Sequence, residues 1–193
     1  TIATLLRRLG YATCHVGKWH LNGYFNNPKQ PQPNDHGYDH WMATQNNAGP
    51  SHKNPNNFAR NGKAVGEIKG YSSQIIVDEA IHWLAKERDK DKPFLLSVWF
   101  HEPHLPIESD PKFQANYPDI LKTDPDKAQH HGNITQADER KVDWRFANSA
   151  GPGAAVAPLK DKRSISQASM RSKPLADICS TRRSRSRDKT CAS

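Results

Sequence analysis

Residues 94–100 are the stretch that most constrains the fold of this sequence, because every side chain there except Ser97 is apolar. Such a run is typical of a β-strand buried on both faces of a parallel sheet. It follows a predicted helix at residues 72–90, where one face carries an apolar stripe at helical spacing, formed by Ile76, Ala80, Trp83 and Leu84. Residues 1–9 and 11–16 form an earlier helix–strand pair. Two such pairs predict an α/β fold with a central sheet flanked by helices.

Lysine and histidine side chains gather just after the two predicted strands, at Lys18, His20, His101 and His104. Ligands of α/β sheets bind outside the carboxyl ends of the strands, so these positions can share one site. In an extended backbone Lys18 and His20 point to the same side, with Trp19 on the other side as a packing anchor. A fixed cation beside a titratable imidazole suits an anionic ester. A surface lysine next to a space-filling histidine is the alternative interpretation of the pair.

Several ordered motifs carry a family resemblance. The segment G-Y-A-T-C-H-V-G-K-W-H-L at residues 10–21 closely resembles the second signature of the sulfatase family. Similar family segments follow in order: G-Y-D at 37–39, N-G-K at 61–63, P-H-L-P at 103–106 and a helix start at 130–138. Over residues 1–139 the chain is therefore identified as a member of the sulfatases of the alkaline-phosphatase-like superfamily, similar to arylsulfatases and N-acetylgalactosamine-6-sulfatases. The resemblance implies a sulfuric ester hydrolase that acts on a sulfate-ester small molecule or a sulfated glycan.

The resemblance also implies roles for three residues. Lys18 would bind a sulfate oxygen, and His20 would hydrogen-bond the formylglycine hydrate that serves as the nucleophile in this family. His104 would contact the sulfate and protonate the leaving oxygen. We expect a structural role for His101, and we expect His36 and His40 to shape the mouth of the pocket or its substrate face.

Formylglycine and calcium are the cofactors that the family implies. Formylglycine is made from the cysteine of a C-x-[PS]-x-R or C-x-A-x-R motif, and Cys14 lacks the required neighbours. Cys179 has Arg183 at the right distance, but Thr181 replaces the Pro or Ala, and we treat this match as coincidence. The resemblance places the nucleophile and the calcium ligands outside this sequence. We therefore expect an internal fragment of a sulfatase that holds no metal ligands and is inactive by itself.

The basic charge is concentrated at the end of the chain. Of the net charge of +8, residues 151–193 contribute ten Lys and Arg against three Asp, and they contain no aromatic residue. Such a segment cannot bury enough apolar surface to order itself. We predict a partial catalytic domain at residues 1–144 and a disordered or out-of-frame basic tail at residues 145–193. The codons of V-D-W-R at 142–145, read one base later, allow the S-I-G that resembles the family; a genuine tail is the alternative.

Two other functions fit parts of the sequence. A phosphonate or phosphodiester hydrolase of the same superfamily would share the fold and the lysine–histidine chemistry. A small RNA-binding protein would use the Ser/Arg-rich tail, although that tail lacks aromatic residues for base stacking. We therefore expect no nucleic acid as partner. We expect no membrane as partner either, since no run of 18 apolar residues exists. The compartment is undetermined from this sequence, because no signal peptide is visible in it. The family resemblance adds only that related sulfatases are often exported, periplasmic or lysosomal.

Overall fold

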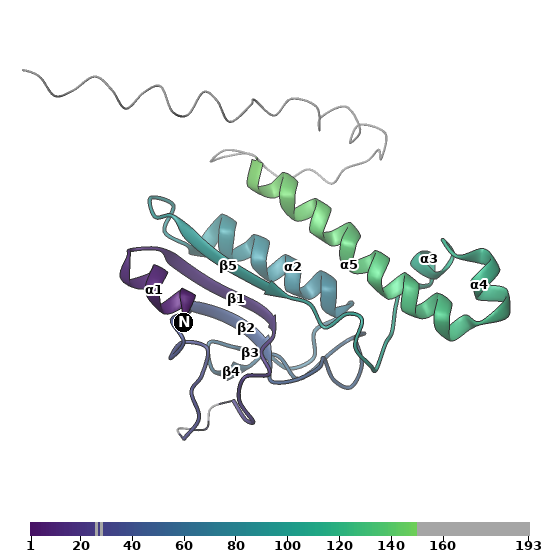
Figure 1. Cartoon of the computed structure of the whole chain (residues 1–193), viewed down its shortest axis with the longest axis horizontal. Coiled ribbons are helices and arrows are strands. Elements are labelled where there is room, and N and C mark those ends of the chain that lie inside the picture. The colour runs from purple at the N-terminus through teal and green to yellow at the C-terminus, as the bar shows by residue number, and fades with distance from the viewer. Residues whose placement is uncertain (26, 28, 150–193) are drawn as a thin grey trace, which may run out of the picture. The chain divides into compact units, whose positions relative to one another are not determined.

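The computed structural model describes residues 1–149 apart from Asn26 and Pro28, with side chains described up to residue 139. Five strands form one sheet in the order β4-β3-β2-β1-β5, and helices lie against it (Figure 1). The strands are β1 (Ala12–Lys18), β2 (His40–Thr44), β3 (Ala59–Arg60), β4 (Lys63–Ala64) and β5 (Phe94–Trp99). The helices are α1 (Ile2–Arg8), α2 (Ser72–His82), the π-helical turn η1 (Trp83–Glu87), α3 (Pro111–Gln114), α4 (Pro118–Thr123) and α5 (Pro125–Ser149).

The sheet combines a parallel centre with an antiparallel hairpin. Strand β1 pairs in parallel with both β2 and β5, whereas β3 pairs antiparallel with β2 and with β4. The hairpin between β3 and β4 turns at Asn61 and Gly62, whose φ angles are 49° and 84°. Two successive positive φ angles at an Asn-Gly pair are the geometry of a tight hairpin turn.

Helices cover both faces of the sheet. On one face α2 buries Ile76 against Cys14, Val16 and Met42 of the strands. On the other face a second cluster joins Ala3 of α1 to Trp19, Tyr38, Trp41, Ala43 and Ala59. The prediction of a central sheet flanked by helices is therefore confirmed. Helix α5 packs against α2 as a further layer.

The two helices predicted before and after β5 exist, with different ends. The four stripe residues of the first are all buried, which confirms the predicted apolar face: Ile76, Ala80, Trp83 and Leu84. Regular α-helix ends at His82, and the π-helical turn η1 carries the chain only to Glu87 rather than to residue 90. The predicted helix start at residues 130–138 lies inside α5, which begins earlier, at Pro125.

The prediction that residues 94–100 are buried on both faces is wrong. Strand β5 lies at the edge of the described sheet. Phe94 and Trp99 at its two ends are 37% and 42% exposed, and the residues between them are half-buried. An apolar run predicts burial only where neighbouring elements cover both faces, and the strand's sequence does not reveal its place in the sheet.

The predicted boundary between residues 144 and 145 falls inside helix α5. Residues 150–193 lie outside the described residues, and with them most of the predicted basic tail. Within the described part of the chain, no helix combines the length and the apolar character needed to cross a bilayer.

Candidate active site

Three parallel strands bring their carboxyl ends to one edge of the sheet. In the strand register Lys18 at the end of β1 faces Thr44 at the end of β2, and Gly17 faces Trp99 at the end of β5. The segments that leave these strands carry Lys18, Asn47 and His104. Their placement agrees with the general position of ligand sites in α/β sheets.

The side-chain amide of Asn47 links Lys18 to His104. The ammonium Nζ of Lys18 donates to Asn47 Oδ1 at 2.8 Å. Asn47 Nδ2 lies 2.7 Å from Nδ1 of His104 and 2.8 Å from the carbonyl oxygen of Leu105. The backbone carbonyl of Asn47 accepts a hydrogen bond from Asn57 Nδ2 at 2.8 Å, which holds the loop in place. A lysine ammonium and an imidazole therefore contact the same side-chain amide at the carboxyl ends of the strands.

The backbone changes direction between Lys18 and His20. The extended conformation ends with Lys18, and His20 has a φ of 49°, so strand alternation does not determine where its side chain points. The backbone N–H of His20 donates to the carbonyl of Gln45 at 2.7 Å, and the residue is exposed. Trp19 is only 2% exposed and packs in the core, as its predicted role as an anchor requires. Convergence of His20 with Lys18 and His104 stays a prediction.

His101 lies in the protein interior beneath this edge. It is 2% exposed, its ring packs edge-on against Phe58, and its Nε2 lies 2.6 Å from the hydroxyl of Thr44. That hydroxyl donates to the carbonyl of Asn46, so it accepts from His101 Nε2–H. Burial, with the charges of His52 and Lys18, lowers the pKa of His101 to about 3. A buried neutral histidine of this kind fits the structural role expected for it.

A second buried histidine lies next to His101. His52 is fully buried, and its ring centroid is 6.0 Å from that of His101. Asn133 Nδ2 of helix α5 lies 3.3 Å from His52 Nδ1. Burial, together with the charge of His104, lowers the pKa of His52 to about 4. The two histidines therefore connect the floor of the site to helix α5.

The expectation that His40 shapes the pocket mouth is wrong. His40 begins β2 and so lies at the strand end opposite Thr44. It is buried between two carboxylates, with Nε2 3.0 Å from Glu79 and Nδ1 2.9 Å from Glu87. The G-Y-D motif before His40 indicates a strand, but it does not indicate at which end of that strand the site lies. His36 lies beside Trp19, with ring centroids 5.4 Å apart.

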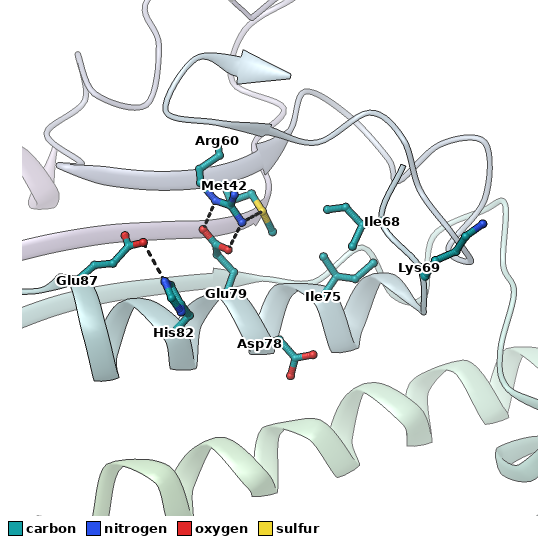
Figure 2. A pocket seen from close by; sticks show the side chains of 9 residues that line it. All are labelled: Met42, Arg60, Ile68, Lys69, Ile75, Asp78, Glu79, His82 and Glu87. Carbon is teal, nitrogen blue, oxygen red and sulfur yellow. Dashed lines mark hydrogen bonds and ion pairs between the residues drawn. The ribbon is translucent and has the colours of Figure 1, made fainter. Parts of the chain in front are cut away.

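The same carboxylates border a cavity on the α2 side of the sheet (Figure 2). The cavity has a volume of about 480 Å³, and Arg60 and Glu79 form a bidentate ion pair in its wall, with contacts of 2.7 and 2.6 Å. Burial raises the pKa of Glu79, but hydrogen bonds from His40 and Arg60 outweigh it and bring the pKa to about 2. None of the three predicted site residues lines this cavity.

The described residues do not fit either implied cofactor. Within them, no three histidine, cysteine or carboxylate side chains converge as a metal site. Cys14 is fully buried in β1, and burial, with the charges of Glu79 and Glu87, raises the pKa of its thiol. A buried thiol of raised pKa is an inert core residue rather than a nucleophile precursor. Cys179 and Cys191 lie outside the described residues.

Sequence reasoning missed Asn47. It lies in the irregular stretch between the predicted strand and the N-G-K turn, and nothing in the motifs marks it. The available signal was positional, because Asn47 follows the buried strand β2 as Lys18 ends β1. Only the pairing of β1 with β2 shows that these two residues are neighbours.

Comparison with known proteins agrees with this fold. The family model described as Sulfatase matches residues 1–178. The chain therefore belongs to the sulfatase family. It is 39% identical over 106 residues to an N-acetylglucosamine-6-O-sulfatase of Bacteroides thetaiotaomicron, a match that covers 54% of this chain and 16% of that protein. It is 33% identical over 133 residues to an ulvan-active sulfatase of Formosa agariphila, with 64% and 24% covered.

A solved structure supports the fold. The chain resembles Ps i-CgsB, crystallised in complex with k-i-k-neocarrahexaose, with a TM-score of 0.65 and 22% identity over 77% of this chain and 36% of that one. The sequence spans about a sixth to a quarter of the length of the two relatives named above.

Proposed function

We propose that the sheet edge around Lys18, Asn47 and His104 binds the sulfate group of a sulfated carbohydrate, as part of the catalytic pocket of a sulfuric ester hydrolase. The observation that carries the proposal is the shared amide of Asn47, which holds an ammonium and an imidazole beside each other at the carboxyl ends of parallel strands. Both groups present N–H donors to an anionic oxygen.

Each residue has a distinct role in this proposal. Lys18 neutralises charge on a sulfate oxygen as a point charge. His104, neutral in the unliganded site, contacts a second sulfate oxygen through Nε2–H. When the ring takes up a second proton, the carbonyl of Leu105 accepts the Nδ1–H and the Nε2 proton passes to the departing alkoxide oxygen. His20 lies next to the strand end, where its exposed side chain would hydrogen-bond a nucleophile supplied by formylglycine. Calcium and formylglycine belong to the family chemistry, and no described residue is assigned to hold either of them.

The substrate class follows from the relatives. One related protein is named for the 6-O-sulfate of N-acetylglucosamine and another for ulvan. We therefore take a sulfated sugar as the probe most relevant to this chain. The relatives give no support to a phosphonate or phosphodiester hydrolase or to an RNA-binding protein.

Binding to the 193-residue chain tests the proposal. Isothermal titration calorimetry would compare the binding affinities of N-acetylglucosamine 6-sulfate, unsulfated N-acetylglucosamine and N-acetylglucosamine 6-phosphate. The sulfated sugar is expected to bind most tightly, and Lys18→Met should weaken its binding about tenfold or more, because a charge-assisted hydrogen bond contributes about 1.5–3 kcal/mol.

Lys53→Met is the matched control, because Lys53 is half-exposed and pairs with Glu108 rather than with Asn47. Equal binding of the sulfated and unsulfated sugars, or equal losses in the two lysine variants, would overturn the proposal. Tighter binding of the phosphate would favour the phosphoryl hydrolase instead.

A further inference from the structure

The orientation of the Asn47 side-chain amide, with Oδ1 toward Lys18 and Nδ2 toward His104, is determined by these neighbours. A lysine ammonium can only donate hydrogen bonds, so the atom of Asn47 that lies 2.8 Å from Lys18 Nζ must be the oxygen. Turning the amide over would place its NH₂ group against the ammonium, donor against donor. Lys18 therefore determines the orientation of the Asn47 side chain.

The other end of the amide then faces two acceptors. Asn47 Nδ2 carries two protons and lies 2.7 Å from His104 Nδ1 and 2.8 Å from Leu105 O. Each proton has one acceptor only if His104 Nδ1 is unprotonated. The proton of the neutral imidazole must then lie on Nε2.

A rival arrangement exists in the same place. His104 Nδ1 also lies 2.7 Å from Leu105 O, a distance at which Nδ1–H would donate to the carbonyl. In that tautomer Asn47 Nδ2 would point its proton at an N–H group, and the amide could not turn away without facing Lys18. The neighbouring groups thus favour opposite tautomers, and Asn47 decides between them.

We propose that Asn47 is a positioning residue through which Lys18 sets the tautomer of His104, so that the neutral ring presents Nε2–H toward the ligand. The consequence for sulfate binding rests on the function proposed above. A bare Nε2 would repel a sulfate oxygen, whereas Nε2–H donates to it. Among the described residues, the hydrogen bonds of the His104 imidazole ring involve Nδ1 alone, which leaves Nε2 for the ligand.

Nuclear magnetic resonance of the ¹⁵N-labelled 193-residue chain tests this directly. Long-range ¹H–¹⁵N correlations distinguish a protonated ring nitrogen from a bare one, at a pH above the range where the ring signals still move. His104 in the unaltered chain should be the Nε2–H tautomer. Asn47→Ala and Asn47→Asp should both convert it to Nδ1–H, because the first leaves only Leu105 O and the second offers a further acceptor.

Asn46→Ala is the matched control. Asn46 is an exposed neighbour whose backbone carbonyl, retained in the variant, serves Thr44, so this variant should keep Nε2–H. Lys18→Met should give a mixture of tautomers, since the amide of Asn47 is then free to turn over.

An Nδ1–H tautomer in the unaltered chain overturns the proposal without any variant, and so does retention of Nε2–H in a folded Asn47→Ala chain. Sulfated-sugar binding measured on the same samples separates this inference from the proposed function. The Nε2–H tautomer without binding of the sulfated sugar refutes the proposed function alone. Binding of the sulfated sugar with the Nδ1–H tautomer refutes the positioning role of Asn47 alone.

Discussion

The ammonium group of Lys18 and the imidazole of His104 contact the same side-chain amide, that of Asn47. The contact joins the end of β1 to the loop that follows β5, and the loop after β2 supplies the amide between them. Three segments distant in the sequence thus meet in one group of hydrogen-bonded side chains at the carboxyl ends of the parallel strands.

The 193-residue chain is expected not to hydrolyse 4-nitrophenyl sulfate, with or without added calcium. A positioned lysine and histidine cannot replace a nucleophile, and Cys14 is buried with a raised thiol pKa. Release of 4-nitrophenolate over hours at high protein concentration measures this. Metal-dependent turnover that is lost in Lys18→Met would contradict it.

Replacing Gly17 should loosen the strand end that carries Lys18. Gly17 has a φ of +105°, and a Cβ built there would lie 1.9 Å from the carbonyl oxygen of Trp99. Gly17→Ala should lower the free energy of unfolding by about 1–3 kcal/mol for the backbone conformation and by about 1–3 kcal/mol more for the overlap. Urea unfolding followed by tryptophan fluorescence measures the loss.

Gly66 provides the control for that substitution. Its φ is +83°, but nothing lies within 4 Å of a Cβ there. Gly66→Ala should therefore show the conformational cost without the overlap. Similar losses at the two glycines would mean that the close approach of β1 and β5 is not tight.

The buried histidines should make the fold sensitive to mild acid. Burial lowers the pKa of His52 to about 4 and that of His101 to about 3, from an ordinary 6.5. In the unfolded chain both bind protons near pH 6.5, so stability is complete above that pH and falls toward pH 4. The slope is about 1.4 kcal/mol per pH unit for each proton.

Unfolding free energies between pH 8 and pH 4 measure this slope. His52→Gln should reduce it by about one proton, whereas His82→Gln, at an exposed histidine, should leave it unchanged. A flat profile across this range would contradict the burial of His52 and His101.

Removing Arg60 should destabilise the fold, because Glu79 is only 5% exposed and would lose a bidentate partner. Arg60→Met is expected to cost about 1–3 kcal/mol at neutral pH. Arg7→Met is the control, since the pair of Arg7 with Asp39 is exposed, and its loss should cost at most about 1 kcal/mol. Equal effects would show that the Glu79 carboxylate is solvated.

The Glu79 contribution also has a defined pH range. The pKa of this carboxyl is about 2 in the fold, against an ordinary 4.5. The unfolded chain therefore takes up the proton first as the pH falls, and the stabilisation present above pH 4.5 is lost toward pH 2. Arg60→Met should reduce this acid-dependent loss.

The sequence by itself determined the family, the class of fold and two of the residues that meet at the site. These properties depend on local patterns: the apolar stripe along α2 and η1, the Asn61-Gly62 turn and the motif that contains Lys18. A local pattern fixes backbone conformation and the face that is buried, so it can be recognised without knowing the neighbours.

The tertiary structure decided which residues are neighbours. In it His40 lies at the strand end away from the site, His101 is buried, and β5 is an edge strand of the described sheet. It also brought Asn47 between Lys18 and His104. The physical reason is that strand order and register bring distant segments together, and the polar contacts they make depend on that pairing rather than on any nearby sequence signal.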